Sequence, residues 1–260
     1  MMNDSELAAA VDANYWEAFS LLAEACGGDV LSTDEVLAVS TGLPVAMLNI
    51  GFVRKPLADP ENLIRKMVEF YDSAALPFVL RLREGVDPRA EEAMEAAGMP
   101  YSDTLPGMAM FPIAGPSAPV SGLEIETVRD MRNLAPYQEV AAAGFGMSID
   151  LVKQLMGPRF LDVPGFESYL GIMDGEPVAT SSMYTGRTTA GVYNVATLTS
   201  HRRQGIGEAM TWHAVTRARE HGCTVATLEA SVMGKPVYER MGFRMVAPYR
   251  TFHRPDKETS

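Results

Sequence analysis

The sequence predicts an α/β fold with a mixed sheet, arranged as two successive units. After residue 122, runs of β-branched and aromatic residues alternate with segments of helical periodicity. Before it, Phe111–Gly122 gathers Pro, Gly, Ser and Ala, so we expect no helix or inner strand to run through this stretch. The first 110 residues also mix short apolar runs with helical patterns. Helices packed on mixed sheets account for all three observations.

The N-terminal region, residues 1–112, is expected to form an α/β domain. Its helical patterns are long enough for ordinary helices, and its apolar runs are short, as in buried strands. The expected helices are Ser5–Cys26, Glu61–Tyr71 and Pro88–Ala97, and the apolar runs are Val36–Val39, Val45–Ile50 and Phe78–Leu82.

A linker at residues 113–122 then leads to a second expected domain, residues 123–260. Strand patterns and helical patterns alternate here, and Gly222 stands where a long helix should end. The expected extended segments are Leu123–Val128, Phe166–Met173, Val178–Tyr184, Val192–Leu198, Thr224–Leu228 and Arg244–His253. The expected helices are Leu134–Ala143, Leu151–Met156, Ile206–His221 and Pro236–Met241.

Composition excludes several classes of protein. The chain has 22 Lys and Arg against 33 Asp and Glu, a net charge of −11, which argues against a general nucleic-acid or anionic-membrane binder. Cys26 and Cys223 lie far apart without metal-ligand spacing, so no metal site is predicted. The acidic start lacks the basic region of a signal peptide, and no apolar run reaches membrane-spanning length. We therefore expect a cytoplasmic protein that does not bind membranes.

A basic, glycine-bearing turn, His201–Met210, joins the strand before it to a long helix. The first N–H groups of a helix lack partners within the helix, and the helix dipole favours an anion there. Gly205 and Gly207 let a phosphate approach those N–H groups, while Arg202 and Arg203 add positive charge. The turn therefore predicts a pyrophosphate site, with an ordinary surface turn as the alternative.

Two motifs in order resemble the GNAT superfamily of N-acetyltransferases. The spacing Arg-x-x-Gly-x-Gly at Arg202–Gly207 resembles the pyrophosphate loop of that family. About thirty residues on, Tyr238, Gly242 and Phe243 match a second family motif, in which Ser231 stands in place of the usual Asn. The resemblance covers Leu123–Arg254, and it implies the GNAT fold with acetyl-CoA as cosubstrate.

The resemblance also implies which residues bind the CoA thioester. The pantetheine arm would pair with the main chain of one strand, and one strand N–H would face the thioester oxygen. Residues implied for the pantetheine are Val195, Ala196, Thr197 and Ser231, those for the pyrophosphate are Arg202, Arg203, Gln204, Gly205, Ile206, Gly207 and Glu208, and Tyr238 lies next to the leaving thiol.

The resemblance implies the general acid, whereas the general base departs from the family pattern. Tyr238 matches the family's general acid, and a pKa of about 10 suits a donor to a thiolate; a packing role is the alternative. Many relatives have a glutamate on or beside the strand before the loop, but residues 190–200 contain no carboxylate, so Glu229, the nearest charged residue to the expected cleft, is the candidate base. A water chain that ends on Glu229 or on a backbone carbonyl, and a solvated or ion-paired role for Glu229, are the alternatives. Ser231 could instead cap the helix that follows it.

The N-terminal region contains an echo of the second motif. Met94–Met99 places a helix end before Gly and an apolar residue, as Tyr238–Phe243 does, but no Arg-x-x-Gly-x-Gly occurs in that half. We interpret the region as a degenerate GNAT-like unit that lost cofactor binding.

The sequence as a whole indicates an acetyl-CoA-dependent N-acetyltransferase that passes acetyl directly to a primary amine of a small-molecule or peptide acceptor. A non-catalytic CoA or acyl-CoA sensor and an enzyme for another acyl-CoA are the alternatives. Neither the acceptor nor the oligomeric state follows from the residues.

Overall fold

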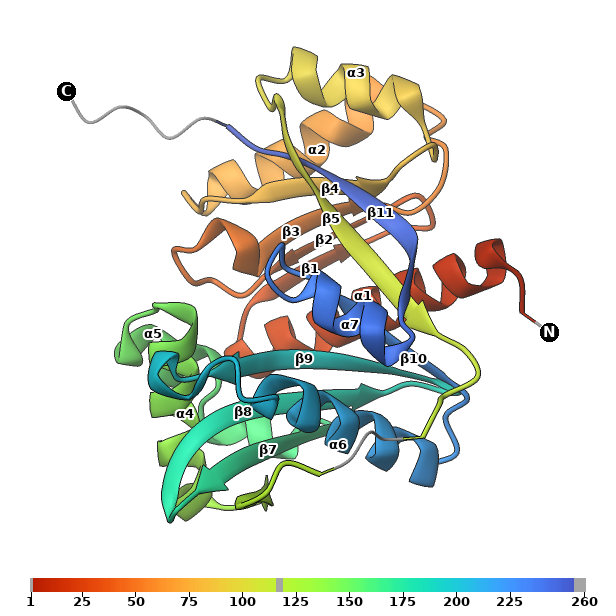
Figure 1. Cartoon of the computed structure of the whole chain (residues 1–260). Helices are drawn as coiled ribbons and strands as arrows, with labels where there is room; N and C mark the ends of the chain where they lie inside the picture. Colours follow the sequence, from red (N-terminus) through yellow and green to blue (C-terminus); the bar gives the residue numbers. More distant parts are fainter. Residues whose placement is uncertain (1, 116–118, 255–260) are drawn as a thin grey trace. The chain divides into compact units, whose positions relative to one another are not determined.

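The computed structural model describes residues 2–115 and 119–254 and confirms the predicted α/β fold with mixed strand directions (Figure 1). Residues 116–118 of the expected linker and 255–260 of the expected second domain lie outside the described residues. None of the helices in the described part is long and apolar enough to cross a membrane.

The chain forms two compact units. The first, here called the cleft unit, comprises Met1–Ala18 and Gly107–Val246, and the second, the companion unit, comprises Phe19–Pro106 and Ala247–Ser260. Three elements contribute residues to both: α1 (Asp4–Cys26), β5 (Tyr101–Met110) and β11 (Arg244–Phe252). The expected division into folding domains at residues 113–122 stays a prediction.

The strands of the cleft unit pair antiparallel, except for one parallel pair. The strand order is β5-β10-β9-β8-β7-β6, in which β10 is parallel to β9 and antiparallel to β5. The bounds are β6 Leu123–Val128, β7 Phe166–Met173, β8 Glu176–Thr185, β9 Thr189–Thr197 and β10 Val225–Glu229. A strand crossing from β9 to a parallel neighbour requires a helical connection, and α6 (Ile206–Glu220) supplies it.

Helices cover both faces of these strands. Ser181 donates to the Met210 carbonyl on α6, whereas its neighbour Ser182 bonds to Tyr137 on α4 (Met131–Phe145). Successive side chains of a strand point to opposite faces, so α6 and α4 pack on opposite sides. This unit also contains α5 (Ile149–Leu155), the short α7 (Lys235–Met241) and the 3₁₀ segments Pro158–Asp162 and Thr199–His201.

The companion unit has the strand order β1-β2-β3-β4-β11, with β3 and β4 parallel and the other pairs antiparallel. Its core gathers the apolar faces of two helices against these strands. The bounds are β1 Asp29–Ser32, β2 Val36–Ser40, β3 Asn49–Val53, α2 Pro60–Ser73, β4 Val79–Arg83 and α3 Pro88–Ala96.

The expected elements of the second region lie within a few residues of the observed ones. In the N-terminal region the apolar run Val45–Ile50 is not one strand, because Ala46–Leu48 forms a 3₁₀ turn and β3 starts at Asn49. The Asn49 amide donates to the carbonyls of Leu43 and Val45, at 2.8 and 3.1 Å, and holds this turn. Strands β1 and β5 were not predicted. β1 has a largely exposed pattern, and β5 contains Pro106 and Gly107, so neither shows a buried-strand signature.

Candidate functional site

Two neighbouring parallel strands of the cleft unit separate part-way along their length. β9 pairs with β10 only from Thr189 to Gly191 in the described register, although β9 runs on to Thr197. Beyond Gly191, the edge of β9 that faces away from β8 therefore has no β10 residue beside it. An unpaired strand edge offers main-chain N–H and C=O groups to a ligand.

The turn after β9 carries the uncapped end of α6. Gly205 adopts a left-handed conformation, with φ of 78°, immediately before the first helical residue, Ile206. Among the described residues no side chain caps this helix. Because the first N–H groups of a helix have no partner within the helix, those of residues 206–208 are available to donate to an anion. Arg203, at φ of 62°, lies exposed in the same turn.

The strand edge and the helix end open into one cavity of about 730 Å³. Most residues that the sequence assigned to CoA binding line it. They are Val195, Ala196, Thr197, Arg202, Arg203, Gly205, Ile206, Gly207, Glu208, Ser231 and Tyr238. Gln204 is exposed in the turn and is not among the lining residues, and neither is Glu229.

Arg202 contributes to the wall of this cavity through its own hydrogen bonds. Its guanidinium donates to the carbonyls of Thr197, at 3.1 Å, and Gly144, at 3.3 Å. It thereby joins the end of β9 to the end of α4. The two segments are close, since a Cβ on Gly144 would come within 2.7 Å of the Ala196 Cβ. Arg202 therefore holds main chain, whereas Arg203 is the exposed cation of the turn.

Tyr238 lies on the α7 side of the cavity. Burial raises the pKa of its hydroxyl above the usual value, and a hydrogen bond with Thr211 offsets part of that rise. The phenol therefore stays protonated at neutral pH and can serve as a proton donor. Gly234 makes room for the ring, because a Cβ there would lie 2.9 Å from the Tyr238 Cε2.

Ser231 forms a turn at the start of α7. Its Oγ accepts the Gly234 N–H at 3.0 Å, and its carbonyl accepts the Lys235 N–H at 2.9 Å. Gly234 is the N-cap of α7 and no described side chain caps this helix, so Ser231 closes the turn before the helix rather than capping it. The side chain is exposed and lines the cavity as well, so its contact with a ligand stays a prediction.

Glu229 ends β10 on the far side of the strand gap. It is partly buried, and its charge is one of the influences, after burial, that raise the pKa of Tyr193 well above the ordinary value. Thr227 is the Cα partner of Gly191, and two residues further on Glu229 and Tyr193 point to the same face of the strands. The candidate base thus lies beside the gap rather than on the cavity wall.

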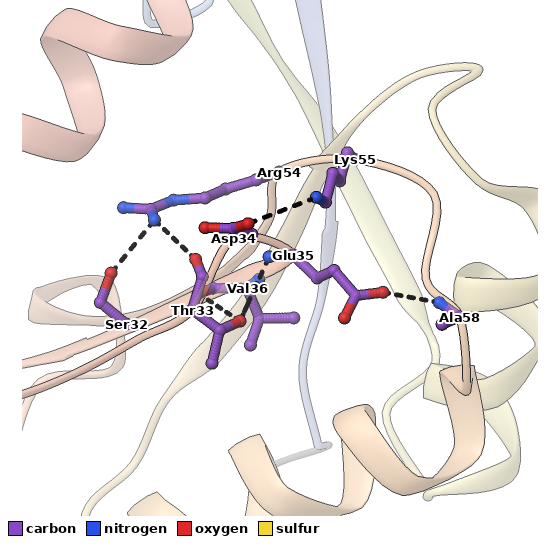
Figure 2. A network of polar contacts seen from close by, with 8 residues as sticks. All are labelled: Ser32, Thr33, Asp34, Glu35, Val36, Arg54, Lys55 and Ala58. Atoms are coloured by element: carbon purple, nitrogen blue, oxygen red, sulfur yellow. Dashed lines mark hydrogen bonds and ion pairs between the residues drawn. The ribbon is translucent and has the colours of Figure 1, made fainter.

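In the companion unit, the turn between β3 and α2 corresponds to the β9–α6 turn. Its N–H groups at Leu57 and Ala58 already have hydrogen-bond partners within the chain. Figure 2 shows the segment before α2 held against the β1–β2 turn: Arg54 donates to Ser32 Oγ and the Thr33 carbonyl, and Glu35 accepts the Ala58 N–H at 2.6 Å. The Leu57 N–H, which is not drawn there, donates to the buried Asp87 carboxylate at 2.7 Å.

The start of α2 is closed as well. The Asp59 side chain caps the helix by accepting the Asn62 N–H, and Pro60 occupies the first helical position. The chain's own carboxylates therefore occupy the donors that an external anion would need.

The comparisons with known proteins agree with this geometry. The sequence profile of the Acetyltransferase (GNAT) family matches residues 136–243, which contain β7 to β10, α6 and α7. Residues 136–243 thus form a GNAT-family domain, and the resemblance inferred from the two motifs is confirmed. Membership in this family indicates acyl transfer from an acyl-CoA.

Solved structures show the same fold over nearly the whole chain. A GCN5-related N-acetyltransferase from Kribbella flavida has a TM-score of 0.74 at 20% identity and covers 96% of this chain and 97% of its own. A tandem GNAT protein from the clavulanic acid biosynthesis pathway has a TM-score of 0.60 at 14% identity, with 98% of each chain covered. A GCN5-related N-acetyltransferase from Sphaerobacter thermophilus has a TM-score of 0.61 at 15% identity and covers 85% of this chain and 78% of its own. At these identities the likeness concerns the fold, and it confirms the prediction of two tandem GNAT-like units.

Several cavity residues were not assigned to CoA binding from the sequence: Gly144, Phe145, His201, Met233, Gly234, Val237 and Arg240. Gly144 and Phe145 come from the end of α4, which no spacing rule connects with the β9–α6 turn. Within residues 2–115 and 119–254, no three His, Cys, Asp or Glu side chains come together as a metal-binding group.

Proposed function

We propose that the protein is an acetyl-CoA-dependent N-acetyltransferase that passes acetyl directly to a primary amine of a small-molecule or peptide acceptor. One observation carries the proposal. A single cavity combines an uncapped helix start, the unpaired edge of β9 and a partly buried phenol. A phosphate, an extended amide-containing arm and a leaving thiolate each need one of these features.

The proposed cofactor site fits the chemistry of CoA. The N–H groups of Ile206, Gly207 and Glu208 would donate to the pyrophosphate oxygens, with Arg203 adding charge. Gly207 leaves this approach open, because even a Cβ there would meet only the Thr197 Oγ1, at 3.6 Å. Val195, Ala196 and Thr197 would bind the pantetheine through their main chain.

The acyl-CoA supplies an activated carbonyl carbon bonded to sulfur. The deprotonated amine forms a new bond to this carbon, and the carbon–sulfur bond then breaks. Tyr238 donates its proton to the departing sulfur and recovers a proton from solvent. The amine loses its proton to Glu229, which then releases it to solvent. We propose Glu229 as the base acting through water because it stands beside the cavity rather than on its wall.

A cytoplasmic location and the choice of acetyl over longer acyl groups belong to the same proposal. The net charge of −11 tolerates a cationic amine, since an acidic surface attracts one in its protonated form.

Binding and turnover measurements test the proposal in sequence. Calorimetry with CoA should give a dissociation constant that Arg203→Ala raises by about tenfold, since a charge-assisted hydrogen bond is worth about 1.5 kcal/mol. Lys55→Ala, which removes a half-exposed cation from the corresponding turn of the companion unit, should leave it unchanged.

Thiol release from acetyl-, propionyl- and succinyl-CoA across a panel of amines then examines the reaction. Acetyl-CoA with at least one primary amine should give the fastest release. CoA binding without release on any amine would favour a sensor, and a preference for another acyl group would correct the acetyl assignment.

A further inference from the structure

A β-bulge lies in β9 next to the proposed acyl site. Ser182 pairs with Tyr193 and Thr180 pairs with Ala196, so one residue of β8 faces two residues of β9. The extra residue, Asn194, has φ of 53°, a left-handed conformation that Asn tolerates better than most side chains. Val195 follows directly and lines the cavity.

Side-chain hydroxyls hold this bulge, in addition to the main-chain ladder. Thr180 Oγ1 donates to the Asn194 carbonyl at 2.8 Å, and the Asn194 side-chain amide donates to Ser182 Oγ at 3.3 Å. Ser182 Oγ also bonds to Tyr137 at 2.7 Å and to Ser168 Oγ at 2.9 Å. A hydroxyl has one proton and two lone pairs, so these three contacts satisfy Ser182 completely.

Burial makes this network specific. Thr180, Ser182 and Tyr137 are fully buried, and Ser168 is nearly so. A buried hydroxyl or carbonyl that loses its partner costs about 1–3 kcal/mol, so arrangements that leave a member of the set unpaired are disfavoured. Asn194 is therefore held through both its carbonyl and its side chain.

The direction of the Val195 N–H follows from these bonds. In a trans peptide the carbonyl and the N–H point in opposite directions, so a carbonyl of Asn194 turned toward Thr180 on β8 turns the Val195 N–H away from β8. The ladder agrees with this direction. The Leu198 N–H donates to the Val178 carbonyl on β8 at 2.9 Å, and alternate N–H groups of an antiparallel strand share a direction, so that of Ala196 faces β8 and that of Val195 does not.

We propose that Thr180 and the hydroxyl cluster of Tyr137, Ser168 and Ser182 are positioning residues for acyl transfer, because they fix the Asn194–Val195 peptide with its N–H toward the cavity. This inference rests on the proposed function and deepens it. During attack, electrons move onto the acyl oxygen, and an N–H fixed in advance stabilises that charge without reorganising.

The central variant is Thr180→Val, which keeps the shape of the side chain and removes the donor to Asn194. Loss of one oxyanion donor lowers kcat by about 10²–10³. A misdirected donor should cost less, so we expect about 10–100-fold in kcat with acetyl-CoA. The affinity for CoA, which has no acyl oxygen, should stay within about threefold. Thr180→Ser restores the hydroxyl and should recover most of the rate.

A second readout does not depend on turnover. The ¹⁵N–¹H resonance of Val195 should shift when acetyl-CoA binds and shift much less with CoA, and Thr180→Val should abolish that difference. If Thr180→Val does not fold, Ser182→Ala is carried through the same measurements and decides the result.

The outcomes separate this inference from the function beneath it. Wild-type kcat in Thr180→Val, or equal losses of CoA affinity and kcat, would overturn the positioning role alone. Failure of the unaltered protein to bind CoA would overturn both. If it binds acyl-CoA without turnover, the proposed function fails, and the Val195 resonance still decides the inference.

Discussion

The two units build the same strand–turn–helix and use it in opposite ways. In the cleft unit, β9 leads through Gly205 into a helix that no described side chain caps. In the companion unit, β3 leads into α2 through a turn whose N–H groups at Leu57 and Ala58 donate to Asp87 and Glu35. The first N–H groups of α6 are thus left available to a ligand, whereas those before α2 already donate to carboxylates of the chain.

The strands before the two turns, β3 and β9, also differ: the edge of β3 is covered and the edge of β9 is open. β3 pairs with β4 through its last residue, Val53, so no gap opens between them. The space is also filled, since a Cβ on Gly51 would lie 2.6 Å from a Leu80 methyl carbon. β9 leaves β10 after Gly191 and exposes its edge. Among the described residues of the companion unit, neither an uncapped start of α2 nor an open edge of β3 beside β4 is therefore present.

The helix that follows β4 in the companion unit, α3, and the helix that follows β10 in the cleft unit, α7, end in the same way. The Met99 N–H donates to the Met94 carbonyl and the Phe243 N–H to the Tyr238 carbonyl, each at 3.0 Å. The intervening glycines, Gly98 and Gly242, are both left-handed. Met94 is thus the counterpart of Tyr238 in the main chain, and only the side chain differs.

The largest expected effect comes from making the cleft unit match its companion at that position. Tyr238→Met removes the proton donor, and general acids contribute about 10²–10⁴ to a rate, so we expect kcat to fall about 10³-fold. Tyr238→Phe should lower kcat by a similar factor. CoA affinity should change far less in both. Because burial raises the pKa of Tyr238, the unaltered kcat should show no loss from this group until above about pH 10. Unchanged steady-state turnover in both variants would remove Tyr238 from the mechanism.

The next effect concerns charge at the helix start. Gly207→Asp adds a second carboxylate, beside Glu208, to the first turn of α6, where it should stabilise the helix and repel phosphate. We expect CoA affinity to fall by about 100-fold with no loss of thermal stability. Gly207→Ala is the control, because its Cβ makes an ordinary contact of 3.6 Å with Thr197 and carries no charge. Equal losses in the two variants would mean that bulk, not charge, governs the site.

A smaller effect should appear in the companion unit, and only in stability. Asp87 is 3% exposed and accepts the N–H groups of Leu57 and Arg89. Asp87→Ala should therefore destabilise this unit by about 2–3 kcal/mol in chemical denaturation, with CoA binding unchanged. Asp34→Ala, which removes an exposed carboxylate 3.9 Å from Lys55, should have no measurable effect. A loss of CoA affinity in Asp87→Ala would contradict the separation of roles.

Asp87 should also make the stability of the companion unit fall at low pH. Burial opposes ionisation of Asp87, but hydrogen bonds from Leu57 and Arg89 and the Arg89 charge outweigh it and lower the pKa. A lowered carboxyl pKa contributes stability above the unfolded value of about 4, and that contribution is lost as the pH falls through the lower folded value.

The smallest expected effect concerns how the stability of the cleft unit depends on pH under mildly acidic conditions. Burial and the Arg217 charge lower the pKa of His213 in the cleft unit, although Glu220 and Glu167 oppose them. The unfolded chain then binds a proton that the folded one does not, so stability should fall as the pH drops below about 6.5. His213→Phe keeps an aromatic ring against Tyr169 and should flatten that slope, by at most one proton or about 1.4 kcal/mol per pH unit. Denaturation at pH 7, 6 and 5 measures it.

The sequence predicted what depends on neighbours along the chain. The strand before the phosphate turn, the start of α6 at Ile206 and the glycine after it at Gly222 all follow from local periodicity and backbone preference. The role of Gly144 could not be predicted, because it arises from contact with Ala196, which lies 52 residues further along the chain. Strand β5 escaped prediction because Pro106 and Gly107 interrupt its pattern, although Gly107 still pairs with Glu229.

The contact between Gly144 and Ala196 also limits how this sequence can change. With 2.7 Å between the Ala196 Cβ and a hypothetical Cβ on Gly144, the two positions share a volume that holds one methyl group. Growth at one position requires a smaller residue at the other or a shift of α4 away from β9. Across related sequences the two positions should therefore vary together, and the bond from Arg202 to the Gly144 carbonyl should vary with them.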